Sequence, residues 1–476
     1  MKTDESRTKI IATLGPATSN REILKELFLS GLDVCRLNFS HGKHEDHLNL
    51  IQLIRGLNDE LATNVAILAD LQGPKLRIGE IENNSMYVPA GHILTITSEK
   101  CIGNLERVYL SYPQFAMDVH PGEFLLVDDG KLKFEVIETN LIDKVLVKMV
   151  NGGELSSKKG VNLPNTKVSQ PSMTEKDIAD AKFALEHDVE WIALSFVRAA
   201  TDILELKEII RKSRKHSLVI AKIEKPEALK EIDNIIDVSD GIMVARGDLG
   251  VEVDYDMVPL IQKEIVEKCI SQSKPVIIAT QMMESMITNF RPTRAEATDV
   301  ANAVLDGADT LMLSGETSVG KYPKLVVESM HKIIQYTEEK AYRFFRGIAP
   351  EEFTPSFLED SICYNACNLA QQSNAKAIIT FSYSGYTAFK IASYRPKANV
   401  FVFTNNKSLI PKMSLLWGVK AYFYDEYSSI ENAIQFTIEK LKTEEYLKMD
   451  DIVVHIASLP MHAKGRPNLV KISYVL

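Results

Sequence analysis

Eight short apolar runs, each followed by an amphipathic helical pattern, constrain the fold of this chain more than any other feature. The runs are rich in β-branched residues and continuous, not alternating, as expected for strands buried on both faces of a parallel sheet. They cover residues 9–14, 34–39, 65–70, 191–196, 218–223, 241–245, 275–280 and 310–314. Eight such units in order predict an α/β fold, a closed (β/α)₈ or TIM barrel.

The third run is separated from its helix by residues of different character. That helical pattern opens at Thr174 and carries Asp177 three residues later, like a capping box. The intervening residues contain short strand-like runs and hairpin turns such as DDG. We therefore expect an inserted small β-barrel domain at residues 71–167, hinged as a lid over the carboxyl end of the barrel. The barrel itself is assigned to residues 1–70 and 168–345.

A new pattern begins after residue 345. Residues 346–357 contain two prolines and no periodicity, which indicates a linker. Five apolar runs then alternate with helical stretches up to the last residue. This pattern predicts a separate open α/β domain at residues 346–476.

Composition and charge exclude several classes of partner. The 476 residues carry a net charge of −9 and a pI of about 5.7, which argues against nucleic acid or an anionic membrane as the main partner. Five cysteines without metal-ligand spacing indicate free thiols in a reducing compartment. No apolar run approaches the roughly 18 residues of a membrane helix, and the first residues lack a signal-peptide pattern. A cytoplasmic location is expected.

Polar residues gather at the predicted carboxyl ends of the strands, where barrel enzymes place their chemistry. Seven of the eight strand ends carry charged or hydroxyl residues, more than random loop polarity explains. The residues are Arg36, Asn38, Ser40, His41, Asp70, Ser195, Lys222, Glu224, Lys225, Arg246, Asp248, Thr280, Gln281, Ser314 and Glu316.

The chemistry of this set is specific. Glu224 and Asp248 are hard oxygen donors that suit Mg²⁺, although ion-paired loop carboxylates are the alternative. Lys222 lies two residues before Glu224 and points the same way in an extended strand, so it could stabilise a transferring anion or form a plain salt bridge. Arg36 can hold phosphate oxygens bidentately, and Gly247 allows backbone amides to approach an anion.

The same inventory favours phosphoryl transfer to or from a small phosphorylated acid, assisted by a divalent metal. No cysteine, histidine cluster or Ser-His-Asp order indicates covalent catalysis. Residues 315–322, GETSVGKY, nearly match a P-loop, but Tyr322 stands where that pattern needs Ser or Thr. We therefore do not assign a P-loop.

The chain closely resembles the pyruvate kinase family over nearly its whole length. The stretches that carry the resemblance occur in the family's order and several are long. They are TKIIATLGPAT, CRLNFSHG, DLQGPKLRIG, SKKGVNLP, AKIEKPEAL, DGIMVARGDLGVE, PVIIATQMMESM and RPTRAEATDVANAVLDGADTLMLSGET.

The resemblance implies the reaction of phosphoenolpyruvate with ADP to give pyruvate and ATP. It implies that Lys222 contacts the transferring phosphoryl group and Arg36 the substrate phosphate. Gly247 and Asp248, through backbone amides, would hold the pyruvate carboxylate together with Thr280, on the side where the enolate carbon is protonated. Glu224 and Asp248 would hold Mg²⁺ (or Mn²⁺), with a second ion arriving with the nucleotide.

The nucleotide and monovalent-cation sites are also implied by the resemblance. Arg77 and Lys159 on the lid, with Lys158 as the neighbouring candidate for Lys159, would bind nucleotide together with a loop that contributes Asn38, Ser40 and His41. The family's potassium site matches Asn38, Ser40, Asp70 and the carbonyl of Leu71.

Potassium dependence is expected to differ in this chain. Potassium-dependent members have Thr, Lys and Glu where this chain has Leu71, Gln72 and Lys75, so the chain resembles the potassium-independent subgroup. The Lys75 ammonium has the charge of K⁺ and could lie against Asp70, Asn38 and Ser40. The alternative is a solvated surface lysine.

The C-terminal domain resembles the family's activator loop only in outline. Ser382, Ser384, Gly385 and Thr387 are kept, but Tyr383 and Tyr386 replace basic residues, and basic residues recur at Lys464 and Arg466. A phosphate-binding effector site is implied, with a sugar monophosphate or AMP fitting at least as well as fructose 1,6-bisphosphate. The family also implies a homotetramer.

Two other hypotheses about the function stay open from the sequence alone. A magnesium-dependent barrel lyase or aldolase acting on phosphoenolpyruvate or pyruvate would share the metal carboxylates but would not need Arg77 and Lys159. A non-catalytic paralogue would be expected to lack at least one of Lys222, Glu224, Asp248 and Thr280, and all four are present.

Overall fold

The centre of the molecule is a closed barrel of eight parallel strands. The computed structural model describes residues 6–352, 354–426, 429–459 and 466–476. Around the barrel the order is β1-β2-β3-β13-β14-β15-β16-β17, and β17 pairs with β1. The strands are β1 (Lys9–Thr13), β2 (Val34–Asn38), β3 (Ala66–Asp70), β13 (Trp191–Leu194), β14 (Leu218–Ile223), β15 (Gly241–Ala245), β16 (Val276–Ala279) and β17 (Thr310–Leu313). They coincide with the eight predicted runs, so the TIM barrel is confirmed.

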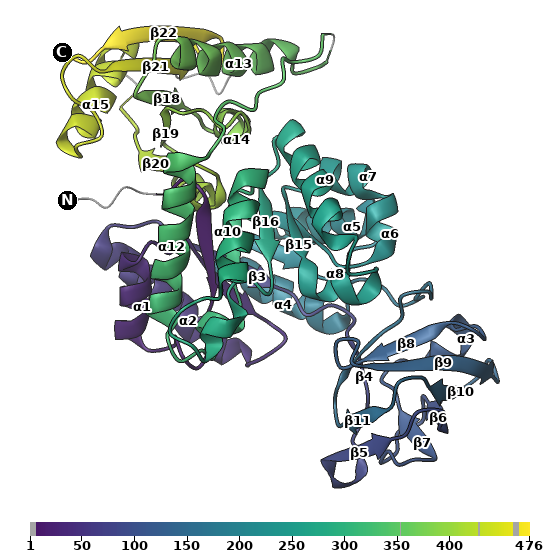
Figure 1. The fold of residues 1–476 in the computed structure, drawn as a ribbon. Helices are drawn as coiled ribbons and strands as arrows, with labels where there is room; N and C mark the ends of the chain where they lie inside the picture. The colour runs from purple at the N-terminus through teal and green to yellow at the C-terminus, as the bar shows by residue number, and fades with distance from the viewer. Residues whose placement is uncertain (1–5, 353, 427–428, 460–465) are drawn as a thin grey trace.

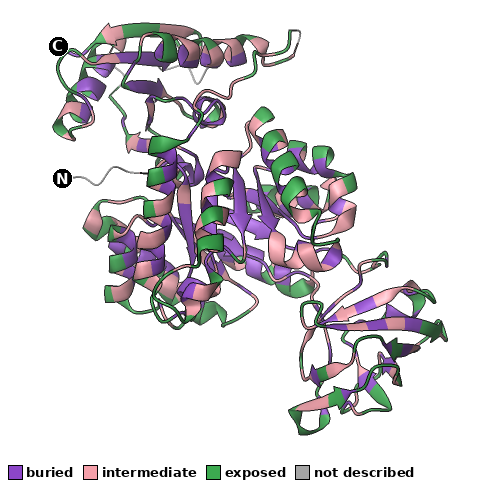
Figure 2. Ribbon diagram, viewed as in Figure 1, coloured by how far each residue is buried: buried purple, intermediate pink, exposed green. Residues whose placement is uncertain are grey.

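Helices surround the barrel and bury the outer faces of its strands (Figures 1 and 2). They are α1 (Arg21–Leu29), α2 (His44–Leu61), α4 (Glu175–Glu186), α5 (Ala200–Ser213), α6 (Pro226–Lys230), α7 (Ile232–Val238), α9 (Val258–Ser271), α10 (Arg294–Asp306) and α12 (Pro323–Lys340). Short helices α8 (Arg246–Glu252) and α11 (Gly315–Ser318), and the 3₁₀ turn η2 (Glu284–Ile287), follow β15, β17 and β16. The predicted capping box of α4, between Thr174 and Asp177, is present.

The insertion between β3 and α4 is a β domain with its own core. A seven-stranded sheet has the order β4 (Leu76–Arg77), β12 (Gly160–Asn162), β8 (Phe124–Val127), β9 (Leu132–Thr139), β10 (Lys144–Met149), β6 (Ile93–Thr97), β7 (Arg107–Tyr109). A bridge between Ile78 and Leu110 joins the chain just past its two edge strands, so the sheet curls on itself. The remaining elements are η1 (Glu82–Asn84), α3 (Phe115–Asp118) and the pair β5 (Ser85–Val88) and β11 (Gly153–Ser156). We retain residues 71–167 as the proposed extent of this domain.

The C-terminal domain is an open five-stranded sheet, as predicted. Its order is β20 (Val419–Phe423), β19 (Asn399–Thr404), β18 (Ala377–Phe381), β21 (Ile452–Ala457), β22 (Leu469–Tyr474). The first four strands are parallel, and β22 runs antiparallel to β21. Its helices are α13 (Phe357–Gln372), α14 (Tyr386–Ser393) and α15 (Ile430–Thr443), with 3₁₀ turns η3 (Lys407–Leu409) and η4 (Pro411–Leu415).

The insertion and the C-terminal domain lie at opposite ends of the barrel (Figure 1). The C-terminal domain closes the amino-terminal end: Leu415, at the end of η4, is fully buried among the side chains that fill the barrel interior, including Trp191 and Ile220. The Leu415 carbonyl accepts a 3.0 Å hydrogen bond from the Thr310 hydroxyl. The carboxyl end is thereby left for the insertion and the candidate site.

Two sequence expectations concern features other than the fold. All five cysteines are free, and Cys101 is the one that is not buried. Within the described ranges, no helix combines the length and the apolar character that crossing a membrane requires.

Candidate active site

A buried polar network at the carboxyl end of the barrel contains five residues predicted from strand ends. The Asp70 carboxylate, at the end of β3, receives the Arg36 Nε at 2.6 Å and the Lys222 Nζ at 3.2 Å. The Lys222 ammonium also lies 2.9 Å from Glu224 Oε1 and donates to the Ser195 hydroxyl at 2.7 Å. Strands β2, β3, β13 and β14 are neighbours in the barrel, which explains why residues so distant in sequence meet.

The ionisation of this network follows from burial and from the neighbouring charges. Burial alone would raise the pKa of Asp70, but Lys222 and Arg36 outweigh it and hold the pKa below the ordinary value. Burial opposes the charge of Lys222, and the carboxylates of Asp70 and Glu224 nevertheless raise its pKa. The pKa of Glu224 is raised, first by burial and further by the negative charge of Asp248. Asp70 is therefore paired with two cations, Arg36 and Lys222, whereas Glu224 shares Lys222 with it and has the negative charge of Asp248 nearby.

Most of the predicted site residues line one cavity of about 130 Å³. Its walls come from the barrel loops and from the start of the insertion. Predicted residues that line it are Arg36, Asn38, Ser40, His41, Asp70, Leu71, Lys75, Arg77, Lys222, Glu224 and Asp248. The structure therefore brings together most of the candidate residues near the barrel axis.

Thr280 and Gly247 meet beside this cavity. The Gly247 N–H donates to the Thr280 hydroxyl at 2.7 Å, and a Cβ on Gly247 would lie only 3.3 Å from that oxygen. Thr280 has φ of +69°, rare for a β-branched residue, and Arg246 donates to its carbonyl at 2.9 Å. Asp299 binds the Arg246 guanidinium in turn, at 2.7 and 2.8 Å. An unusual backbone conformation is thus held by a partly buried ion pair.

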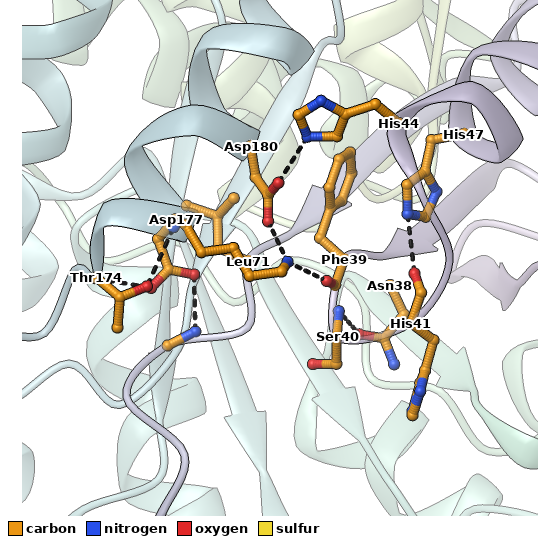
Figure 3. Close-up of polar contacts among 12 residues, drawn as sticks. Asn38, Phe39, Ser40, His41, His44, His47, Leu71, Thr174, Asp177 and Asp180 are labelled. Atoms are coloured by element: carbon orange, nitrogen blue, oxygen red, sulfur yellow. Dashed lines mark hydrogen bonds and ion pairs between the residues drawn. The ribbon is translucent and has the colours of Figure 1, made fainter. Parts of the chain in front are cut away.

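The loop after β2 forms a second wall of the cavity. Asn38 Oδ1 accepts the Ser40 N–H at 3.1 Å, which folds the loop back on itself (Figure 3). The N–H of Phe39 donates to the Asp70 carbonyl at 3.0 Å. The Leu71 carbonyl accepts the Ser195 hydroxyl at 2.7 Å.

The residues of the insertion that were predicted to bind nucleotide differ in whether they line the cavity. Arg77 lines the cavity, and its guanidinium donates to the Lys158 carbonyl at 3.0 Å. Lys159 does not line the cavity; it forms a 2.8 Å ion pair with Asp128 inside the insertion. Lys158 points to Glu80, at 3.4 Å.

Lys75 lies at the junction of barrel and insertion. It lines the small cavity and also a neighbouring one of about 740 Å³ that Asp248 and the insertion residue Asp129 share. Its Cε packs against the backbone of β12, 3.4 Å from where a Cβ on Gly160 would sit. Across the described residues, its ammonium has no hydrogen bond or ion pair with a protein group, whereas Asp70 is paired with Arg36 and Lys222.

The candidate effector residues lie in the C-terminal domain, far from this cavity. Ser382 Oγ accepts the Gly385 N–H at 3.1 Å in the loop before α14, and Thr387 is buried. Arg466 pairs with Glu359 at 3.0 Å. The predicted Lys464 lies outside the described residues.

Several residues of the site were missed by sequence reasoning. Thr13 accepts the Arg36 guanidinium at 2.9 Å, and its signal was available because it is the last residue of β1. Ser195 was counted among the strand ends but was given no role. Lys176 and Asp180, which support the loop after β2 from outside the cavity, had no such signal because they lie on a helix and not at a strand end.

These features define a barrel enzyme whose site, which combines cationic and carboxylate side chains, opens toward an inserted domain. The model of the pyruvate kinase barrel domain matches residues 5–327, and that of the pyruvate kinase alpha/beta domain matches residues 360–473. Pyruvate kinase of Corynebacterium efficiens is 41% identical over 98% of both chains. That of Mycobacterium tuberculosis is 40% identical, also over 98% of both.

The structural comparison agrees. A solved pyruvate kinase from Cryptosporidium parvum superposes with a TM-score of 0.91 at 34% identity, covering 99% of this chain and 97% of the other. The chain belongs to the pyruvate kinase family. It transfers the phosphoryl group of phosphoenolpyruvate to ADP, giving pyruvate and ATP, and the lyase alternative is thereby set aside.

Proposed function

We propose that the buried network around Lys222 carries the phosphoryl transfer in this chain. The observation that supports this most is the position of the Lys222 ammonium, 2.7 to 3.2 Å from Ser195, Glu224 and Asp70 in the wall of the cavity. A fixed positive charge in a buried site stabilises the charge that moves in the transition state without reorganising first. Arg36, anchored by Asp70 and Thr13, would hold the phosphate of the substrate.

We propose Glu224 and Asp248 as the ligands of Mg²⁺. Both line the cavity, and the raised pKa of Glu224 reflects burial and a neighbouring negative charge that a cation would relieve. Mg²⁺ can take two carboxylates and complete its shell with water and substrate oxygens, so these two side chains would be sufficient protein ligands. When bound, magnesium would supply Lewis-acid stabilisation of the phosphoryl and enolate oxygens.

Thr280 and Gly247 are proposed to hold the carboxylate of the substrate. The Gly247 N–H is engaged by the Thr280 hydroxyl, so the substrate carboxylate would share or replace that hydrogen bond. The Thr280 hydroxyl, directly or through water, would bring the proton to the enolate carbon.

The proposed nucleotide site combines the loop of Asn38, Ser40 and His41 with Arg77 and Lys159. Lys159 is bound to Asp128 away from the cavity, so its participation requires the insertion to move. Such a movement is what a hinged lid would provide.

Lys75 is proposed to act as a built-in monovalent cation that makes added K⁺ unnecessary. Its uncommitted ammonium lines the same cavity as Asn38, Ser40, Asp70 and Leu71, the residues that match the family's potassium site. Its contact with Gly160 joins its position to that of the insertion.

The remaining expectations rest on the family. We propose a homotetramer acting in the cytoplasm, with a sugar monophosphate or AMP as effector near Ser382, Ser384, Gly385, Thr387, Arg466 and the predicted Lys464. The pairing of Arg466 with Glu359, and of Lys390 with Asp360 at 3.1 Å, reduces the positive charge available to a bisphosphate.

The first experiment is pyruvate formation from phosphoenolpyruvate and Mg·ADP in potassium-free buffer and with added KCl. We expect full activity without potassium. Lys75→Glu should lose about tenfold or more in potassium-free buffer and recover with KCl, since each factor of ten corresponds to about 1.4 kcal/mol of transition-state stabilisation. Lys182→Glu, a charge reversal at an exposed position of α4, is the control.

The two parts of the proposal fail separately. If the unaltered enzyme needs KCl, the role of Lys75 is wrong and the kinase assignment stands. If Lys222→Met keeps its kcat, the proposed role of Lys222 is wrong whatever the salt.

A further inference from the structure

Helix α4, which the chain enters on returning from the insertion, holds the loop proposed to bind nucleotide. The contact runs through the Lys176 side chain in the first turn of the helix. Its Nζ donates to the Phe39 carbonyl at 2.6 Å and lies 2.5 Å from Asp180 Oδ2. Lys176 and Asp180 are four residues apart, so they lie on one face of the helix.

Asp180 connects this contact to the helix that follows the loop. It is 3% exposed, and its Oδ1 lies 2.7 Å from Nε2 of His44, the first residue of α2 (Figure 3). The His44 ring stacks on Phe183, with centroids 4.3 Å apart. Asp180 therefore fixes both the ammonium that grips the loop and the residue at which the loop ends.

Phe39 is the residue through which this grip acts. Its side chain is 1% exposed and stacks on His47 at 4.1 Å, so the ring points into the protein. The flanking residues Asn38 and Ser40 line the cavity. Holding the Phe39 carbonyl fixes the peptide that joins Phe39 to Ser40, and hence the direction of the Ser40 N–H and side chain.

Lys176 and Asp180 differ in which groups lose a partner when each is replaced. Without the lysine, Asp180 would keep His44 as partner, so no buried carboxylate would be stranded. Loss of the lysine therefore loosens the loop with little damage to the core. Loss of the Asp180 charge would affect both Lys176 and His44 and is the harsher change.

We propose that Lys176 and Asp180 are positioning residues for nucleotide binding: they hold the loop of Asn38, Ser40 and His41 in the shape that receives ADP. Neither residue lines the cavity or touches the reacting groups. The inference rests on the proposed nucleotide role of that loop.

The test compares Lys176→Met, Lys176→Arg and the exposed control Lys182→Met on the same helix. We expect Lys176→Met to raise KM for ADP about tenfold, with kcat and KM for phosphoenolpyruvate changed less than about twofold, because ground-state nucleotide binding is what weakens. The arginine, which keeps a donor, should recover most of the loss. Equal KM for ADP in Lys176→Met and Lys182→Met would overturn the proposal.

A second readout follows the loop itself. Hydrogen–deuterium exchange of the peptide that spans residues 38–43 should speed up in Lys176→Met and not in Lys182→Met; unchanged exchange would overturn the positioning role. Asn38→Ala tests the nucleotide role of the loop separately from the positioning role of Lys176. If it leaves KM for ADP unchanged, the proposed nucleotide role of the loop is wrong, and faster exchange in Lys176→Met would then report a structural contact only.

Discussion

The main-chain N–H of Gly73 donates a 2.9 Å hydrogen bond to the Asp177 carboxylate, 104 positions further along the chain. The other oxygen of that carboxylate accepts the N–H and the hydroxyl of Thr174, at 2.8 and 2.6 Å. Gly73 lies where the chain leaves the barrel for the insertion, and Thr174 lies where it returns. Asp177 is fully buried, so one carboxylate fastens both chain crossings.

Removing the charge of Asp177 should loosen both crossings at once. In Asp177→Asn one of the two oxygens becomes an amide nitrogen that cannot accept, and a buried donor loses its partner. We expect a loss of about 1–3 kcal/mol in the free energy of unfolding. We also expect faster proteolysis between residues 71 and 75, measured together with the thermal midpoint.

The matched control is Asp202→Asn. Asp202 occupies the equivalent position of α5, where it accepts the N–H groups of Arg198 and Ala199; among the described residues its carboxylate has no hydrogen bond to residues 71–167. Equal proteolysis of the insertion junction in the two variants would show that Asp177 is an ordinary helix cap.

A second connection joins the insertion to the barrel near the proposed metal ligands. The Asn162 side chain on β12 donates to Glu252 Oε1 at 2.8 Å, and Lys225, next to Glu224, reaches the same oxygen at 2.5 Å. Asn162→Leu breaks the first contact and leaves Glu252 paired with Lys225. The expected result is a broader distribution of distances between spin labels at Asp129 and Tyr255, because a hydrogen bond of about 1–2 kcal/mol no longer holds the insertion.

An exposed asparagine in the same segment, Asn165, provides the comparison. Asn165→Leu should keep the distance distribution of the unaltered protein. A narrow, unshifted distribution in Asn162→Leu would mean that other contacts fix the insertion.

Leu415 should stabilise the barrel although it belongs to the C-terminal domain. Its side chain is fully buried with Trp191 and other residues of the barrel interior. Truncation in Leu415→Ala leaves a cavity there and should cost about 2–5 kcal/mol. With Trp417→Phe as background, Trp191 fluorescence reports unfolding of the barrel, and its urea midpoint should fall.

Leu409→Ala serves as the reference because Leu409 is 4% exposed and packs in the core of the C-terminal domain itself. We expect it to shift the Trp191 signal less than Leu415→Ala does. The reverse order would contradict the role of Leu415 as a plug of the barrel.

Acid should destabilise the C-terminal domain through His455. This residue is fully buried on β21, neither ring nitrogen has a hydrogen-bond partner in the described residues, and burial lowers its pKa to about 4. The unfolded state, with a pKa of about 6.5, takes up the proton first as the pH falls, so stability is lost from about pH 6.5 down to about pH 4.

The size of this loss can be measured directly. Urea unfolding of the unaltered protein should show about 2 kcal/mol less stability at pH 5 than at pH 7.5 from this residue, and His455→Leu should remove that part. An identical pH dependence in the two proteins would mean that His455 is not responsible.

The sequence predicted the fold well because most strands are buried on both faces and leave an apolar signature. Site residues near the barrel axis could be predicted equally well, because the end of each apolar run marks the end of a strand. Arg36, Asp70, Lys222 and Glu224 were found in this way. Thr13 obeyed the same rule and was overlooked. By contrast, the capping box of Asp177 was predicted, but its bond to Gly73 depends on the folded barrel bringing two distant segments together.

Conformations of side chains resist prediction for a similar reason. Differences of a fraction of an ångström in atomic position decide which of several carboxylates pairs with an ammonium group. Lys159 was placed with the nucleotide and is found on Asp128, and Lys75 was placed against Asp70, whose oxygens are occupied by Arg36 and Lys222.

The fastening of both crossings to Asp177 has a consequence for how such a molecule can be built and altered. Because Gly73 and Thr174 meet at one carboxylate, the span between them can be exchanged for a short turn without moving β3 or α4. The insertion can therefore be added, deleted or exchanged as one unit by a single recombination event, while the barrel stays closed. A chain assembled in this manner can acquire a cover for its active site while the strands of the barrel keep their places.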